Sequence, residues 1–143
     1  CEIPKAAVDK AAAACSEAGA KRAVPLKVSG PFHSALLKGA GEKLGEALED
    51  VEIHEIKVPY LTNVTADYVR STDDVKGYLK QQVSSSVRWQ QTVERLIADG
   101  ADEFVEIGPG RSLAGFMRKI DRNVKVYNIQ TVEDAEKVCE ELL

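Results

Sequence analysis

The sequence lacks the cysteine pattern of a secreted scaffold or of a zinc site. Its 143 residues contain only three cysteines, Cys1, Cys15 and Cys139, and no Cys-x-x-Cys pair. Disulfide frameworks need paired cysteines, and zinc sites need cysteines or histidines at close spacing. We therefore expect no disulfide and no bound metal, and the cysteine usage favours the reducing cytoplasm.

The sequence also lacks long apolar runs and an excess of basic residues. No apolar stretch approaches the roughly 20 residues that span a bilayer, and no charged-then-apolar leader is seen. Lys and Arg number 19 against 23 Asp and Glu, which gives a formal net charge of −4. A chain without basic excess gains little from displacing phosphate counterions. We therefore expect neither a membrane nor a nucleic acid as partner.

The residues that are present have the balance of a globular protein, with 44% hydrophobic and 29% charged residues. Their periodicity distinguishes helices from strands. Helical spacing predicts helices over 4–18, 34–49, 74–84 and 88–99, another ending near 120, and a last one from about 132. Alternation or short apolar runs predict strands over 22–28, 55–64, 104–107 and 124–128. Helices that alternate with strands predict an α/β fold with a largely parallel sheet.

Three local patterns refine this prediction. Gly19 stands where the first helix needs a left-handed C-terminal cap, and Thr131 with Asp134 forms a plausible capping box for the last helix. Glycines within the second helix weaken its propensity by up to about 1 kcal/mol each. We expect close packing against another element to offset that cost; the glycines are Gly39, Gly41 and Gly45.

One of the two histidines is a candidate for catalysis. His54 lies among carboxylates in a polar segment, and we assign it no role. His33 follows a Gly-Pro turn and precedes Ser34, a good N-cap residue. This places an imidazole at a strand-to-helix junction, where α/β sheets commonly present functional groups. The competing interpretation is a histidine that caps or packs beneath the helix.

A convincing nucleophile is missing. A histidine base needs a nucleophile and a group that orients its other ring nitrogen, but the nucleophile-elbow pattern Gly-x-Ser-x-Gly does not occur. In Gly110-Arg111-Ser112-Leu113-Ala114-Gly115 the second glycine comes one position too late. Ser112 is better interpreted as the N-cap or first residue of a helix, and residues 84–86 as a helix end or loop.

Several motifs in order resemble those of malonyl-CoA:acyl carrier protein transacylases. They are Gly19-Ala20-Lys21-Arg22, Leu26-Lys27-Val28-Ser29-Gly30-Pro31-Phe32-His33-Ser34, Asn63-Val64, Val87-Arg88-Trp89 and Glu106-Ile107-Gly108-Pro109-Gly110. The resemblance covers essentially all 143 residues and corresponds to the C-terminal part of such an enzyme. It implies that residues 1–28 end a small ferredoxin-like subdomain. Residues 29–143 would then be the later part of an α/β-hydrolase-like large subdomain.

The resemblance also implies a chemistry. In this family a serine attacks the thioester of malonyl-CoA while a histidine takes its proton, and the malonyl group then passes to the phosphopantetheine thiol of acyl carrier protein. His33 matches the histidine, and Gln82 the residue whose backbone carbonyl orients it. Phe32 matches a position where a bulky ring favours malonyl units, and Asn63 a substrate-binding position. The implied reaction uses no cofactor.

The matching part lacks the rest of that machinery. The nucleophilic serine, the arginine that pairs with the malonyl carboxylate, and the oxyanion donors belong to the N-terminal half of the family. Arg88 and Arg111 do not align with the arginine, and Ser86 stands where the family usually has proline. Together with the initial Cys1, this predicts a fragment that needs its missing half and exposes sheet edges and apolar faces by itself.

Two other functions remain open from the sequence. One is a non-catalytic fragment, or a docking half that binds carrier protein through the basic residues Arg70, Arg118, Lys119 and Arg122. The other is a hydrolase that pairs Ser112 with His33.

Overall fold

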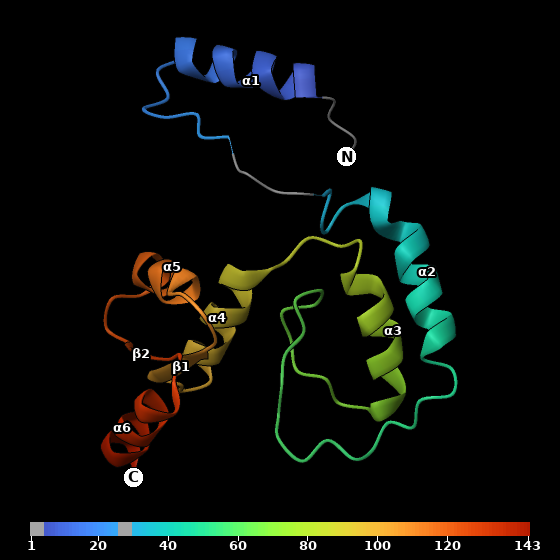
Figure 1. Ribbon diagram of the computed structural model, residues 1–143, viewed down its shortest axis with the longest axis vertical. Coiled ribbons are helices and arrows are strands. Elements are labelled where there is room, and N and C mark those ends of the chain that lie inside the picture. Colours follow the sequence, from blue (N-terminus) through green and yellow to red (C-terminus); the bar gives the residue numbers. More distant parts are fainter. Residues whose placement is uncertain (1–4, 26–29) are drawn as a thin grey trace. The chain divides into compact units, whose positions relative to one another are not determined.

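The computed structural model describes residues 5–25 and 30–143. It contains six α-helices, one 3-10 turn and two strands within those ranges (Figure 1). In chain order they are α1 (Lys5–Glu17), η1 (Ala35–Leu37), α2 (Lys38–Ala47), α3 (Thr72–Gln82), α4 (Trp89–Ala98), β1 (Glu103–Ile107), α5 (Ser112–Ile120), β2 (Lys125–Ile129) and α6 (Val132–Leu142). The chain divides into two compact units, one of residues 1–64 and 68–87, the other of 65–67 and 88–143.

All six predicted helices are present, and their ends follow the local signals. Gly19 has φ +93°, and the N–H of Ala20 bonds the Cys15 carbonyl at 2.9 Å, as a left-handed C-terminal cap requires. At the other end of the chain, Thr131 and Asp134 form the predicted capping box of α6. The second helix differs slightly, because its first turn is the 3-10 turn η1.

In the first unit, α2 and α3 lie side by side (Figure 1). A Cβ placed on Gly41 would lie 2.9 Å from the backbone oxygen of Lys80, and one on Gly45 would lie 3.0 Å from its Cδ. The two glycines therefore allow the close packing that the sequence predicts. A Cβ placed on Gly39 would meet nothing within 4 Å, so Gly39 is not needed for the close packing of the two helices.

The predicted strand over 55–64 is wrong. This segment is irregular apart from one antiparallel bridge between Leu61 and Tyr68. A strand needs a partner along its length, and the described residues supply only that bridge. Val58 accordingly remains 72% exposed. Of the strand predicted over 22–28, residues 22–25 are irregular, and 26–28 lie outside the described ranges.

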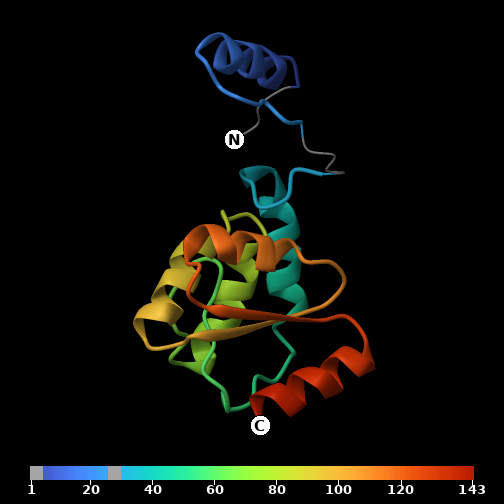
Figure 2. The same cartoon turned by 90° about the vertical axis from the view of Figure 1, so that its left-hand side faces the viewer.

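The second unit is built on a parallel pair of strands, as predicted. β1 and β2 pair in register from Glu103 with Lys125 to Ile107 with Ile129. The helices α5 and α6 both pack on β2 and lie on opposite sides of the pair (Figure 2). The buried residues of the second unit include Val93, which is 1% exposed, and Met117, which is 2% exposed.

Several apolar side chains are exposed within the described residues. Ile107 at the end of β1 is 78% exposed, and Val132 at the start of α6 is 72% exposed. The sheet of the second unit has only two strands, so each strand has one edge without a partner among the described residues. The subdomain boundary predicted between residues 28 and 29 falls outside the described ranges and stays a prediction.

Candidate active site

The candidate base, His33, lies in a tight turn just before η1. Its φ is +57°, the left-handed region that few non-glycine residues adopt. The hydroxyl of Ser34 donates to the Pro31 carbonyl at 2.7 Å and closes this turn. Ser34 does occupy the N-cap position of η1, but its side chain makes no capping hydrogen bond. An unusual backbone conformation held in place by neighbours is common at functional sites.

The structure brings His33 and Gln82 together. Nδ1 of His33 lies 2.9 Å from the backbone oxygen of Gln82, 49 positions away in sequence. Gln82 is the last residue of α3, where helix carbonyls lack intrahelical partners. A carbonyl can only accept a hydrogen bond, so the neutral imidazole carries its proton on Nδ1. Nε2 is then left with a lone pair that can accept a proton.

Two contacts, one from α3 to α2 and one from α3 to the turn after α2, hold this pair in place. Lys80, two residues before Gln82, forms an ion pair with Glu42 on α2. The hydrogen bond from Lys80 lowers the pKa of the Glu42 carboxyl from its usual value. Further along α3, Lys76 donates to the Glu49 carbonyl at 2.9 Å. The helix that follows His33 is thereby fixed to the helix that ends at Gln82.

Phe32 and Asn63, the two predicted substrate-binding residues, have less defined surroundings. The Phe32 side chain lies against Gly30, with a ring carbon 3.4 Å from where a glycine Cβ would stand, but the residue is 63% exposed. Asn63 is half-buried next to the bridge at Leu61. No hydrogen bond joins Asn63 to His33 or Gln82 among the described residues.

Two residues considered from the sequence, Ser112 and Arg88, belong to the second unit. Ser112 is the first residue of α5, as predicted, and belongs to the second unit, whereas His33 belongs to the first. The Arg88 guanidinium donates to the Thr65 carbonyl at 2.9 Å. His54 lies 3.7 Å from a Glu52 carboxylate oxygen and is highly exposed.

Sequence reasoning missed the residues that shape the loop between β1 and α5. The Glu106 carboxylate accepts the backbone N–H groups of Leu113 and Ala114 at 3.1 and 3.0 Å, and so caps α5 from outside the helix. Gln130 accepts the N–H of Gly110 at 2.9 Å, where φ is +91°. The signal available was a carboxylate, Glu106, between the apolar residues Val105 and Ile107 just before Gly-Pro-Gly.

Neither a metal centre nor a membrane segment is found in the part of the chain that the structure describes. Within residues 5–25 and 30–143, no three His, Cys, Asp or Glu side chains are grouped so that they could hold a metal ion. No helix in the same ranges combines the length and the apolar character needed to cross a membrane.

The fold is shared with solved acyltransferases. A crystal structure of MCAT from Streptococcus pneumoniae superposes with a TM-score of 0.85 and 37% identity, over 96% of this chain and 45% of that one. A malonyl-transacylase solved in complex with a type II PKS acyl-carrier protein superposes with a TM-score of 0.88 and 36% identity, over 96% of this chain and 44% of its own. These neighbours are acyltransferases, and the likeness to them is consistent with an α/β fold for this chain.

The particular resemblance is to malonyl CoA-acyl carrier protein transacylases, as the sequence motifs predicted. The enzyme of that name from Bacillus subtilis (strain 168) is 42% identical over 135 residues, which cover 94% of this chain and 43% of the relative. That from Haemophilus influenzae is 40% identical over 139 residues, covering 97% of this chain and 45% of the relative. The chain thus spans less than half the length of these relatives. No protein-family model matches it.

Proposed function

We propose that this chain supplies the catalytic base of a malonyl-CoA:acyl carrier protein transacylase, a cytoplasmic enzyme of fatty acid synthesis, and corresponds to its C-terminal portion. The observation that carries the proposal is the 2.9 Å hydrogen bond between His33 Nδ1 and the Gln82 carbonyl. It joins two residues that the motif resemblance selected independently of any structure. It also leaves Nε2 as the ring atom that exchanges protons with the reacting groups.

In the proposed reaction, His33 Nε2 takes the proton of a serine hydroxyl as its oxygen attacks the thioester carbon of malonyl-CoA. The C–S bond breaks, and the imidazolium returns the proton to the leaving thiolate of coenzyme A. The phosphopantetheine thiol of acyl carrier protein then gives its proton to His33 and attacks the malonyl-serine ester. The serine oxygen leaves and takes that proton back. No cofactor takes part.

The position of Gln82 at a helix end suits this role. The C-terminus of α3 carries a partial negative charge, because its last carbonyls are not paired within the helix. Such a charge stabilises a nearby cation by about 0.3–1 kcal/mol at exposed sites. The imidazole acquires positive charge only while it holds the transferred proton. Gln82 would therefore both orient the ring and favour the charged intermediate, as a positioning residue.

The proposed enzyme needs groups beyond these 143 residues. The sequence contains no Gly-x-Ser-x-Gly elbow, so we propose that the nucleophilic serine, the arginine for the malonyl carboxylate and the oxyanion donors come from a missing N-terminal half. Phe32 would restrict the space beside the malonyl methylene, and Asn63 would bind substrate. In such a pocket, one additional methyl group on the acyl unit changes the free energy that discriminates between two substrates by about 1–3 kcal/mol.

The test is malonyl transfer by the full-length enzyme that contains these residues. His33→Ala should lower the rate of transfer from malonyl-CoA to acyl carrier protein by about 10²–10⁴-fold, the usual contribution of a general base. His54→Ala is the matched control, because His54 is the other histidine and is exposed; it should leave the rate unchanged. Near-normal transfer by the His33→Ala enzyme would reject the proposal.

A further inference from the structure

Ser34, the residue that follows His33, directs its hydroxyl away from the helix that it begins. A serine at an N-cap position normally accepts a hydrogen bond from a backbone N–H of the first helical turn. Ser34 is the N-cap residue of η1, but its side chain makes no such bond. Its Oγ instead donates to the Pro31 carbonyl at 2.7 Å. The hydroxyl therefore stabilises the turn that contains His33 rather than the helix that follows.

The turn that this bond closes has a backbone that needs support. It runs from Pro31 to Ser34, and its third residue, His33, has φ +57°. Residues with a Cβ rarely adopt this left-handed region, because the Cβ comes too close to the following carbonyl oxygen. Such a conformation costs free energy and persists only where neighbouring contacts hold it. The bond from Ser34 joins the last residue of the turn to the first, so it limits how far the His33 backbone can relax.

The His33 ring is held at a second point. Its Nδ1 lies 2.9 Å from the Gln82 carbonyl oxygen at the end of α3. The side-chain conformations open to a residue depend on its backbone dihedral angles. The ring therefore keeps this contact only while the turn keeps its left-handed conformation. The bond from Ser34 fixes the backbone of His33, and the bond to Gln82 fixes its ring.

We propose that Ser34 is a positioning residue for the general base of the transacylase reaction, an inference that rests on the proposed function. Its hydroxyl keeps His33 in the left-handed turn, and the turn keeps Nδ1 on the Gln82 carbonyl, so that Nε2 is left to accept the serine proton. Ser34 is not placed as a nucleophile, because its own proton goes to a carbonyl oxygen. The turn is exposed, so water can replace the hydroxyl, and its loss should misalign the ring without unfolding the chain.

The test compares Ser34→Ala with Ser34→Thr. The first removes the hydroxyl but keeps the backbone bond in which the Ser34 carbonyl accepts the Leu37 N–H at 3.0 Å. The second keeps a hydroxyl at a position whose extended backbone, with φ −129°, suits a β-branched side chain. A role of the hydroxyl itself therefore predicts a loss in the alanine variant and rescue in the threonine variant.

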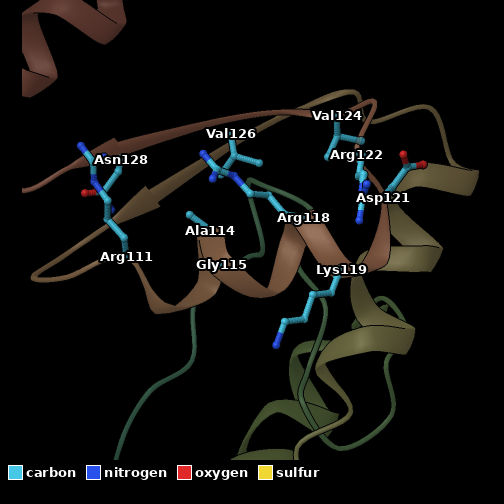
Figure 3. Close-up of a pocket in the computed structure, with 10 residues that line it drawn as sticks. All are labelled: Arg111, Ala114, Gly115, Arg118, Lys119, Asp121, Arg122, Val124, Val126 and Asn128. Atoms are coloured by element: carbon cyan, nitrogen blue, oxygen red, sulfur yellow. The ribbon is translucent and has the colours of Figure 1, made fainter.

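Two other serines provide matched controls. Ser16→Ala also removes a hydroxyl that donates to a backbone carbonyl, that of Ala12 at 3.0 Å, within α1. Ser112→Ala removes a hydroxyl at the start of a helix in the second unit, next to Arg111, which lines the cleft along α5 and β2 (Figure 3). Neither serine belongs to the turn of His33, so both variants should behave like the unmodified chain.

The first measurement is the position of the proton on the neutral His33 ring, by long-range ¹H–¹⁵N NMR of the 143-residue chain. We expect Ser34→Ala to increase the fraction of rings with the proton on Nε2. Ser34→Thr and the two controls should leave this fraction unchanged. Urea unfolding followed by circular dichroism should give the same midpoint for all four variants. A lower midpoint for Ser34→Ala with an unchanged ring would overturn the proposal, because Ser34 would then only stabilise the fold.

The second measurement is malonyl transfer by the full-length enzyme. Ser34→Ala should lower kcat by about 10- to 100-fold, since a displacement of about 1 Å in a reacting group can cost about 100-fold. KM for malonyl-CoA should stay unchanged, and Ser34→Thr should restore most of the rate. Equal losses in the two variants, or a change in KM alone, would overturn the proposal. Normal transfer by His33→Ala would reject the proposed function instead, while the NMR measurement would still decide whether Ser34 holds the ring.

Discussion

The substitution Gly41→Val probes how the position of α2 on α3 determines the His33 hydrogen bond. Gly41 is buried, and a Cβ there would lie 2.9 Å from the Lys80 backbone oxygen, where ordinary contacts begin near 3.4 Å. Backbone cannot rotate away as a side chain can, so the two helices must separate by about half an ångström. Overpacking of this kind costs about 1–3 kcal/mol. The same shift would lengthen the contact between His33 and Gln82.

The matched control is Gly39→Val, in the same helix with nothing within 4 Å of its Cβ position. Both substitutions change helix propensity equally, by a few tenths of a kcal/mol, so the difference between them isolates the clash. Urea unfolding followed by circular dichroism measures their free energies of unfolding. We expect Gly41→Val to be less stable than Gly39→Val by about 1–3 kcal/mol, and malonyl transfer by the full-length enzyme to fall only for Gly41→Val. Equal stabilities and equal rates would refute the reasoning.

Three further predictions concern caps and charge. Glu106→Ala removes a carboxylate that accepts two backbone N–H groups of α5, so it should lower the free energy of unfolding by about 1–2 kcal/mol. Glu103→Ala, which removes only a surface ion pair on the same strand, should lower it by less than about 1 kcal/mol, and equal losses in urea unfolding would contradict the capping role. Ser71→Ala removes the side chain that caps α3 and should cost about 1 kcal/mol, whereas a Ser71→Asp variant should retain most of the stability in the same assay. Backbone N–H groups of Gln130 and Thr131 lower the pKa of Asp134, so this carboxylate stabilises the fold near neutral pH and loses its effect as the pH falls below about 4. The Asp134→Asn chain should therefore show a shallower decrease of thermal stability between pH 5 and 2 than the unmodified chain, and identical decreases would show that Asp134 contributes nothing.

The helices could be predicted from the sequence because their signals are local. The cap at Gly19 and the capping box of Thr131 with Asp134 lie within a few residues of the helix ends that they define. A strand depends instead on a partner that can be far away in sequence. The alternation over 55–64 resembles a strand, but the described residues offer only the bridge from Leu61 to Tyr68. The parallel pair β1 and β2 was predictable because one helix connects two short apolar runs.

The candidate site likewise contains residues that the sequence indicated and residues that it could not. His33 stands out in the sequence because histidine is rare and follows a Gly-Pro turn, but every residue has a carbonyl, so periodicity could not select that of Gln82. Only the family resemblance indicated it. The cap that Glu106 of β1 provides for α5 depends on a contact between two elements, which the sequence does not encode in one short pattern.

The most direct test of the central claim is the protonation of the His33 ring at neutral pH. Long-range ¹H–¹⁵N NMR of the 143-residue chain distinguishes the two ring nitrogens, and His54 provides an exposed internal reference. If the Gln82 carbonyl accepts a hydrogen bond from Nδ1, the neutral His33 ring will carry its proton on Nδ1 and present an unprotonated Nε2. A neutral ring with its proton on Nε2 would contradict the account, because the nitrogen that should accept the serine proton would already be occupied.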